Sequence, residues 1–325
     1  LLYYFKVNEI INNIVKKTRA AVIGVGNMGK HHARVYSQLS NVKLIAVSDI
    51  NEERGKHIAN EFGCKFYKDY RDMLRNEKID AVSIAVPTTQ HKDVALDVIN
   101  AGKHLLIEKP IADTVENGKK IIKAAREKNV KLMIGHIERF NPAVRKLKEF
   151  VKNGVLGEIK TIIAKRVGLF PPQIKDVNVI IDLAIHDIDI CNYILDGKPL
   201  KIYASGGNAL ASKCEDYANI FLKYENTDVF IQVNWITPVK IRVLTLTGTE
   251  GYAELNYITQ NLRIYKSRAK KSEERTFEEV IKVSAPKEIP IQIKKREPLK
   301  EELKAFISYV NGGRCPMPPE DALNS

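Results

Sequence analysis

The sequence predicts an α/β fold with two domains: an N-terminal doubly wound parallel sheet, then an α/β domain with a large open, mostly antiparallel sheet. Three observations lead to this prediction. Short apolar strand patterns alternate with helical patterns through residue 134. A glycine-rich turn joins the first strand pattern to the first helical pattern. From residue 201 onward, strand patterns mostly follow one another with Gly, Asn and Asp turns in place of helices.

The glycine-rich turn has the G-x-G-x-x-G spacing of a dinucleotide-binding loop. A short apolar run predicts a buried strand, and Gly24, Gly26 and Gly29 follow it. The first glycine permits a tight turn, the second lets a pyrophosphate approach the backbone, and the third lets the next helix pack closely. Asn27 and Met28 complete this loop, where N–H groups at the helix start would point at the phosphates.

A carboxylate follows the second strand pattern at the distance expected for a ribose ligand. Asp49 lies twenty positions after Gly29, just beyond the apolar run 42–47. A carboxylate accepts hydrogen bonds from ribose hydroxyls and would repel a 2′-phosphate, so we expect NAD as the cofactor rather than NADP. Arg54 follows nearby, but two acidic residues precede it. The alternative is a glycine turn with a solvent-exposed aspartate.

The remaining elements of the first domain indicate a nearly complete Rossmann fold over residues 19–137. We expect the other strands at 65–67, 80–86, 102–107 and 130–134, and helices at 52–62, 70–76, 92–101 and 114–129. The carboxyl ends of such strands face the cofactor cleft. We therefore expect five residues that follow two of these strands to bind the cofactor: Pro87, Thr88, His91, Glu108 and Lys109.

Three of these five residues have alternative roles. Thr88 or Thr89 would cap the helix that follows. His91 could touch the cofactor or could face solvent in the first turn of that helix. Lys109 stands at a strand end beside the inferred nicotinamide site, and it could instead be a solvated surface lysine.

The second domain is expected over residues 138–325. It should contain a helix at 142–153, a strand at 158–167, a mostly helical stretch at 177–195, strands at 201–205, 216–224, 228–236, 242–247, 251–255 and 261–265, and a helix at 296–310. Residues 266–295 read as irregular, and 318–325 as the start of a truncated final helix. Residues 1–18 form an N-terminal extension, whose helical pattern indicates a helix docked on the core or one that binds a partner.

The helical stretch of the second domain contains a candidate acid/base pair. Asp182 and His186 are four positions apart and would share a helical face, where the carboxylate can fix the imidazole tautomer and raise its basicity. A structural ion pair is the alternative. Metal binding by these two residues with Asp187 and Asp189 is not expected, because Asp187 turns away from His186 and no second histidine is near.

Composition excludes several classes of protein. The 325-residue chain has no apolar run of membrane-spanning length, and its four cysteines form no C-x-x-C pair. Scattered free thiols fit a reducing cytoplasm, so we expect a cytoplasmic protein. The net charge of +13 comes from lysines and arginines without an aromatic-basic motif, which disfavours nucleic acid and suits an anionic small substrate.

The combined motifs resemble the Gfo/Idh/MocA family of NAD(P)-dependent sugar oxidoreductases. The resemblance rests on the glycine loop, Asp49, Glu108-Lys109-Pro110, the stretch 135–142 and Asp182-x-x-x-His186. It implies that Lys109 contacts the reacting hydroxyl, His186 is the acid/base and Asp182 supports it. The stretches around His136 and Asp182 are similar to members that oxidise UDP-N-acetylglucosamine at C3, whereas Ala184, Ile137 and Glu138 depart from the residues that many members carry.

Two arginines and one sheet face extend this prediction to substrate and partners. Arg139 and Arg166 could bind a substrate diphosphate, or they could be an interdomain ion pair and a solvent-facing strand residue respectively. An apolar sheet face predicts a homo-oligomer, a dimer or tetramer. The alternatives to a UDP-sugar dehydrogenase are an inositol or free-sugar dehydrogenase, or a non-catalytic NAD-binding regulator.

Overall fold

The computed structural model divides the chain into two compact units. Unit 1 contains the chain up to Gly135 together with Leu299–Leu323, and unit 2 contains His136–Pro298 together with Asn324–Ser325. The helix expected in the N-terminal extension lies outside the described residues. The described residues are 17–170, 177–210, 214–266 and 287–325.

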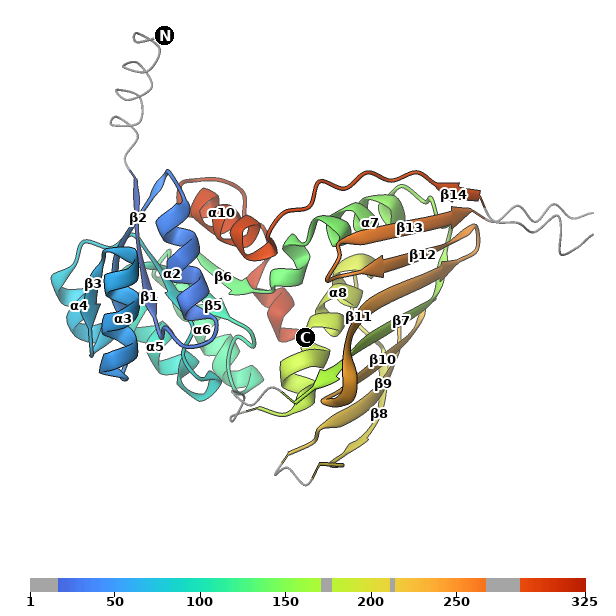
Figure 1. Ribbon diagram of the computed structural model, residues 1–325, viewed down its shortest axis with the longest axis horizontal. Coiled ribbons are helices and arrows are strands. Elements are labelled where there is room, and N and C mark those ends of the chain that lie inside the picture. The colour runs from blue at the N-terminus through green and yellow to red at the C-terminus, as the bar shows by residue number, and fades with distance from the viewer. Residues whose placement is uncertain (1–16, 171–176, 211–213, 267–286) are drawn as a thin grey trace, which may run out of the picture. The chain divides into compact units, whose positions relative to one another are not determined.

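Unit 1 is built on a six-stranded parallel sheet with the order β3-β2-β1-β4-β5-β6 (Figure 1). This is the strand order of a doubly wound dinucleotide-binding fold, so the predicted fold class of this unit is confirmed. The inner strands are almost wholly buried because helices cover both faces. The strands are β1 (Thr18–Ile23), β2 (Val42–Ser48), β3 (Lys65–Tyr67), β4 (Ala81–Ile84), β5 (His104–Glu108) and β6 (Leu132–Gly135).

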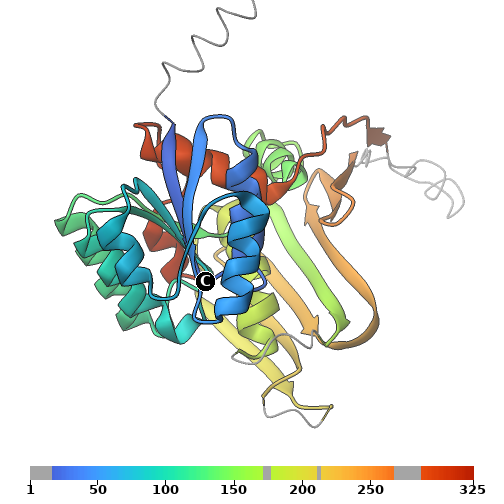
Figure 2. The ribbon, with the colours of Figure 1, turned by 60° about the vertical axis from the view of Figure 1, so that its left-hand side comes forward.

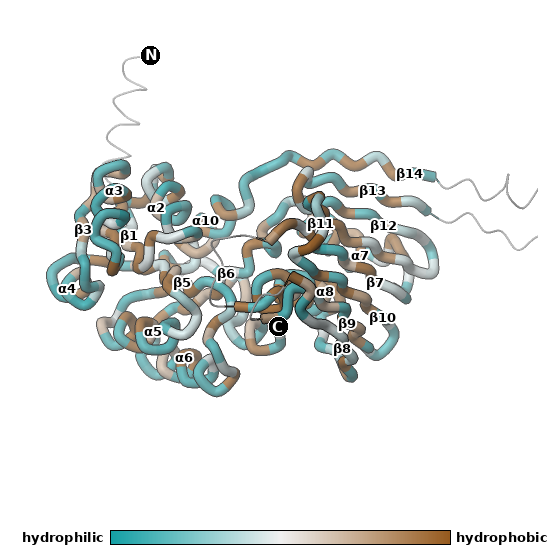
Figure 3. Tube along the Cα trace, turned by 60° about the horizontal axis from the view of Figure 1, so that its bottom comes forward, coloured by the Kyte–Doolittle hydropathy of each residue, from teal (hydrophilic) through white to brown (hydrophobic). Residues whose placement is uncertain are grey.

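Helices α2 to α6 connect these strands. α2 and α3 pack together on one face of the sheet, and α5 and α6 pack together on the other (Figure 2). α3 and α4 are mostly hydrophilic along their length (Figure 3). The bounds are α2 (Gly29–Gln38), α3 (Glu52–Phe62), α4 (Tyr70–Asn76), α5 (His91–Asn100) and α6 (Val115–Glu127).

A C-terminal segment completes unit 1, although the sequence grouped it with the second domain. It consists of helix α10 (Pro298–Val310) and the 3₁₀ helix η4 (Pro319–Leu323), which replaces the expected final helix. Lys131 Nζ donates hydrogen bonds to the carbonyl oxygens of Tyr309 at 2.6 Å and Val310 at 3.2 Å. Helical periodicity could not reveal this assignment, because it does not indicate which sheet a helix packs against.

Unit 2 is built on an eight-stranded sheet with the order β14-β13-β12-β11-β7-β10-β9-β8. Only the β7–β10 pair is parallel, which confirms the mostly antiparallel sheet. The short strand β14 falls in a stretch that the sequence analysis treated as irregular. The strands are β7 (Ile159–Leu169), β8 (Lys201–Gly207), β9 (Tyr217–Lys223), β10 (Asp228–Asn234), β11 (Ile236–Gly248), β12 (Gly251–Asn256), β13 (Asn261–Lys266) and β14 (Lys287–Ile289).

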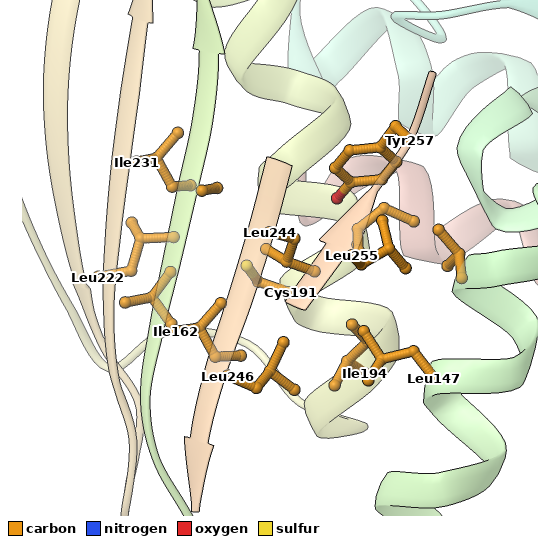
Figure 4. Close-up of a cluster of buried hydrophobic side chains, with 14 of the residues drawn as sticks. Leu147, Ile162, Cys191, Ile194, Leu222, Ile231, Leu244, Leu246, Leu255 and Tyr257 are labelled. Carbon is orange, nitrogen blue, oxygen red and sulfur yellow. The ribbon is translucent and has the colours of Figure 1, made fainter. Parts of the chain in front are cut away.

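Helices cover one face of this sheet and enclose the core of unit 2. α7 (Pro142–Lys152) contacts β12 and β13, and α8 (Ile185–Leu195) contacts β7 and β10. Figure 4 shows Leu147 of α7 near Ile194 of α8, and Cys191 of α8 near the strands. Among the described residues, no helix has both the length and the apolar character that crossing a bilayer requires.

The alternation along the strands separates this core from the opposite face of the sheet. Ala218, Ile220 and Leu222 are buried together, as their spacing predicts. Val233 and Trp235 are buried as well. Both occupy the covered side of their strand and its extension, so neither adds to an exposed apolar face.

The opposite face carries an exposed apolar row. The ring centroids of Tyr203 and Phe221 are 5.9 Å apart, and those of Phe221 and Phe230 are 5.0 Å apart. Phe230 pairs in register with Ile163 on β7, which is half exposed. The row therefore crosses four neighbouring strands, β8, β9, β10 and β7.

β11 starts earlier than the sequence predicts and contains a large bulge. Ile236 pairs with Leu169 of β7, and Ile241 pairs with Val167, so four residues of β11 face the single residue Gly168. The ladder is regular from Ile241 to Thr247, a stretch that contains the predicted strand 242–247. Bulges re-aim side chains and recur beside functional sites.

Candidate active site

The glycine loop of unit 1 has the geometry that a bound dinucleotide requires. Gly24 has φ +81°, in the left-handed region that favours glycine. A Cβ on Gly29 would lie 1.7 Å from the carbonyl oxygen of Gly24, so only glycine permits this close approach of helix and strand. A Cβ on Gly26 would meet nothing within 4 Å, which leaves open space where a pyrophosphate would approach. The loop therefore fits NAD.

The start of α2 is left open for an anion. Helices α3, α4, α6 and α7 each have an N-cap side chain that accepts a hydrogen bond from the first turn. Met28, the N-cap of α2, makes no such bond, so the first N–H groups of α2 are not satisfied by a capping side chain. Such N–H groups, together with the helix dipole, bind phosphates.

Asp49 is fixed at the end of β2 by backbone and side-chain donors. Its carboxylate accepts hydrogen bonds from the N–H of Val25 at 2.9 Å and of Asn51 at 2.8 Å. Arg54 donates to both oxygens, at 3.0 and 2.7 Å, so the carboxylate forms a bidentate ion pair. Asp49 is buried and joined to the glycine loop, which corrects the alternative of a solvent-exposed residue.

The turn after β4 differs from two expectations, a threonine cap and a solvent-facing His91. The 3₁₀ helix η1 (Thr88–Gln90) precedes α5, and neither helix has a side-chain cap, so the expected threonine cap is wrong. His91 is buried rather than solvent-facing. Its Nδ1 lies 2.8 Å from the carbonyl oxygen of Pro110, and its Nε2 lies 3.0 Å from that of Val86. His91 therefore connects the segments that follow β4 and β5.

The Glu108-Lys109 segment is anchored on both sides of the lysine. Glu108 Oε1 lies 2.8 Å from Nε2 of His32 on α2, and His91 holds Pro110. Burial alone would raise the pKa of Glu108, but the hydrogen bond and charge of His32 and the charge of Lys109 hold it below its ordinary value. Lys109 is half buried at this edge of the sheet.

A second buried carboxyl group lies within the electrostatic reach of Glu108. Glu302 of α10 is fully buried, and neither of its carboxyl oxygens has a hydrogen-bond partner among the described residues. Burial, followed by the charge of Glu108, raises the pKa of Glu302 well above its ordinary value. The folded protein therefore favours the protonated form of Glu302.

The candidate acid/base pair of unit 2 lies on an irregular helix. Asp182 belongs to a π-helical turn, η3 (Ile180–Ala184), and His186 belongs to the first turn of α8. Both side chains are half buried. π-helical turns often occur at functional sites. Within the described ranges, no three His, Cys, Asp or Glu side chains gather as a metal-binding group.

Arg166 does not have the free guanidinium that phosphate binding would require. It is buried, and its Nε and Nη2 donate to Asp187 at 2.7 and 3.1 Å. Its Nη1 donates to Glu138 at 3.0 Å, and its Cζ lies 4.7 Å from the ring centroid of Tyr257. Burial favours a lower pKa for Arg166, but the two carboxylates raise it overall. The expectation of solvent exposure is therefore wrong, and a phosphate contact of Arg166 would have to compete with the two carboxylates.

Arg139 is committed to a partner in the same unit. It donates to both oxygens of Asp189, at 2.9 and 2.8 Å, and its Cζ lies 5.1 Å from the ring centroid of Tyr193. His136 Nδ1 lies 3.4 Å from the same carboxylate. The alternative of an interdomain ion pair is therefore corrected to one within unit 2, and a direct phosphate contact would require breaking it.

The structure thus brings the predicted residues together in two groups. The cofactor-binding residues and Lys109 belong to unit 1, and the others belong to unit 2. The sequence alone did not reveal the ion-pair partners that hold these groups in place, because their pairing depends on register and on helix packing: His32, Glu138, Asp187 and Asp189. The G-x-x-H spacing from Gly29 to His32 and the alternating acids of α8 were the available signals.

Comparisons with known families cover both units. Residues 18–136 match the family described as "Oxidoreductase family, NAD-binding Rossmann fold", of the GFO/IDH/MocA group. Residues 144–254 match the GFO/IDH/MocA C-terminal domain. Both matches agree with the division of the chain into a dinucleotide-binding unit and a second unit.

Individual relatives include two kinds of dehydrogenase. The chain is 30% identical to a UDP-N-acetylglucosamine 3-dehydrogenase of Acidithiobacillus ferrooxidans over 297 residues, which covers 91% of this chain and 90% of the relative. It is 27% identical to an inositol 2-dehydrogenase of Salmonella typhimurium over 250 residues, with 73% of each chain covered.

Solved structures agree in fold. The structure of the Acidithiobacillus ferrooxidans enzyme matches with a TM-score of 0.82 at 27% identity, covering 95% of this chain and 94% of that chain. A levoglucosan dehydrogenase in complex with NADH and levoglucosan matches with a TM-score of 0.81 at 20% identity, covering 94% of each chain, which supports the fold alone.

Proposed function

The chain belongs to the Gfo/Idh/MocA family of NAD-dependent sugar-type oxidoreductases, and on that premise we propose that it oxidises C3 of UDP-N-acetylglucosamine to a 3-keto sugar. The observation that carries this choice is the similarity to a UDP-N-acetylglucosamine 3-dehydrogenase over 91% of the chain. The inositol dehydrogenases are 27–32% identical but cover only 58–73% of the chain.

In the proposed reaction, His186 accepts the proton of the sugar hydroxyl while the carbon–hydrogen bond breaks and a carbonyl forms. NAD, when bound, accepts the hydride from that carbon. Lys109 stabilises the partial negative charge on the reacting oxygen, because a sugar hydroxyl is too weak an acid to ionise unaided near neutral pH. Asp182 orients His186 and stabilises its protonated form.

The substrate assignment is tested by screening compounds for NADH formation. UDP-N-acetylglucosamine, other UDP-sugars, myo-inositol and free sugars should be compared with a carbonyl trap present, because NAD-dependent alcohol oxidation is readily reversed. We expect NADH with UDP-N-acetylglucosamine. Turnover of myo-inositol alone would instead support the inositol dehydrogenase alternative, which the 27% identical relatives favour. NAD binding without reduction by any compound would support a non-catalytic regulator.

We also propose that a second copy of the chain covers the apolar row of unit 2. Tyr203, Phe230 and Ile163 are 60%, 46% and 50% exposed, and such contiguous apolar surface usually marks an interface. Light scattering at micromolar concentration should therefore give the mass of a dimer or tetramer. A monomeric mass would contradict this proposal.

A further inference from the structure

Arg242 lies beside Arg166 on the helix-covered face of unit 2. The two residues pair directly in the antiparallel register of β11 and β7. Cross-strand partners project on the same side of a sheet, and on this side Arg166 reaches Asp187 of α8. Two like charges directly opposite each other destabilise a sheet, so each guanidinium needs compensation.

Only one of the two guanidinium groups has that compensation. Arg166 pairs with Asp187 and Glu138. Arg242 has no carboxylate within 4.0 Å among the described residues, and its Nε is buried without a hydrogen-bond acceptor there. A buried donor without an acceptor is costly, and native structures contain few of them. Arg242 is therefore a half-buried cation with an unsatisfied donor.

The bulge of β11 brings a second cation to the same place. Lys240 is the last bulge residue, two positions before Arg242. The charge of Arg242, followed by burial, lowers the pKa of Lys240, and the charge of Arg166 adds to this effect. Burial, followed by the charge of Arg166, lowers the pKa of Arg242 as well. The ammonium and the guanidinium are thus close enough to disfavour each other's charge.

The position of this pair relates it to the acid/base group. The charge of Asp182 acts on Arg242 and partly opposes the lowering of its pKa, as do the charges of Glu138 and Asp187. Arg242 therefore lies within electrostatic reach of the helix segment that carries Asp182. A ligand bound by the two cations would be held next to the residues that transfer the proton.

We infer that Lys240 and Arg242 form a phosphate subsite that binds the diphosphate of a nucleotide-sugar substrate. A planar guanidinium donates to phosphate oxygens in a bidentate manner, and an ammonium adds a mobile point charge. The inference rests on the proposed function, because an uncharged polyol such as inositol would leave both cations without an anion. It also replaces Arg139 and Arg166, whose guanidinium groups already pair with carboxylates.

The subsite is tested by equilibrium binding of UDP to the full chain in saturating NAD, measured by isothermal titration calorimetry. NAD keeps UDP out of the dinucleotide site, and binding does not depend on turnover. We expect Arg242→Gln to weaken UDP binding about ten- to a hundredfold, the range for a charge-assisted hydrogen bond. Lys240→Gln should weaken it by less, and it keeps the fold because Lys240 is exposed.

The matched control is Arg263→Gln, which removes the same charge from an exposed position on β13 of the same sheet. It should leave UDP affinity unchanged. The subsite is overturned if the unmodified protein binds no UDP, or if both subsite variants bind UDP as tightly as the control.

The proposed function fails separately. If NADH forms with myo-inositol and not with UDP-N-acetylglucosamine, while Arg242→Gln still weakens UDP binding, the subsite stands and the proposed substrate does not. If UDP-N-acetylglucosamine is oxidised while the two variants bind UDP normally, the substrate stands and the subsite does not.

Discussion

Unit 1 and unit 2 build their candidate site groups from different parts of the chain. In unit 1, the dinucleotide-binding features are largely backbone: glycine positions, an uncapped helix start and strand ends. In unit 2, the candidate site groups are charged side chains. Most of the cations among them already form ion pairs with carboxylates. Backbone geometry follows from local sequence, whereas the partner of a buried charge follows from register and helix packing. This difference explains why the glycine-loop residues of unit 1 could be assigned from sequence, whereas the partners of the buried charges in unit 2 could not.

The largest expected effect separates proton transfer from cofactor binding. His186→Asn should lower kcat about 10²–10⁴-fold, because a general acid/base is lost. NAD binding should persist, since the glycine loop and Asp49 belong to unit 1. Steady-state NADH formation and an NADH titration measure the two properties.

The matched control is His57→Asn, which changes an exposed histidine of α3 and should alter neither property. Lys109→Met should resemble His186→Asn in both measurements. Near wild-type turnover of His186→Asn would contradict its role, and the base would then be sought at Lys109.

The second prediction tests whether unit 2 depends on its buried charges. Arg166→Met removes the ion-pair partner of the buried Asp187 and the partly buried Glu138, which should lower the free energy of unfolding by about 3–5 kcal/mol. Urea unfolding measures this loss. Arg263→Met on the exposed side of the sheet should change it by about 0.5 kcal/mol at most. Equal losses in the free energy of unfolding for Arg166→Met and Arg263→Met would show that the buried ion pairs stabilise unit 2 no more than an exposed arginine does.

The third prediction contrasts two glycines of one loop. Gly29→Ala places a Cβ against the carbonyl of Gly24, so the free energy of unfolding should fall by about 1–3 kcal/mol as the helix is displaced. Gly26→Ala enters open space and should leave stability unchanged while it weakens NAD binding. Urea unfolding and NAD titration together distinguish the two effects. Normal NAD affinity of Gly26→Ala would contradict the assigned path of the pyrophosphate.

The fourth prediction concerns Glu302, the buried carboxyl group of α10 in unit 1. Its pKa is raised in the folded state, so its contribution to stability is complete below the unfolded pKa and is lost as pH rises through the folded pKa. Between these values, the free energy of unfolding should fall by up to about 1.4 kcal/mol per pH unit.

Glu302→Gln removes this titration and should flatten the pH dependence of stability above about pH 4.5. Urea unfolding from pH 5 to 8 measures the slope. Glu53→Gln, an exposed substitution on α3, should keep the slope of the unmodified protein. An unchanged slope in Glu302→Gln would show that Glu302 is ionised in the folded protein.

These contrasts explain how far the sequence could predict the molecule. The strands and helices of unit 1 and the roles of its three glycines follow from apolar periodicity and local spacing. The two arginines were recognised as functional candidates, but their carboxylate partners come from segments 21 to 50 residues away. Sequence patterns did not single out Arg242, because the absence of a carboxylate partner can be recognised only when the register of β11 and β7 is known.

The return of α10 and η4 to unit 1 has a consequence for synthesis on the ribosome. Residues 18–135 emerge first, but the segment that completes their core and carries Glu302 emerges only after the described strands of unit 2. The N-terminal unit therefore cannot reach its final packing as an independent nascent domain, as domains commonly do. A nascent chain halted before residue 299 should be cleaved by protease within unit 1, and one halted well beyond residue 323 should resist cleavage.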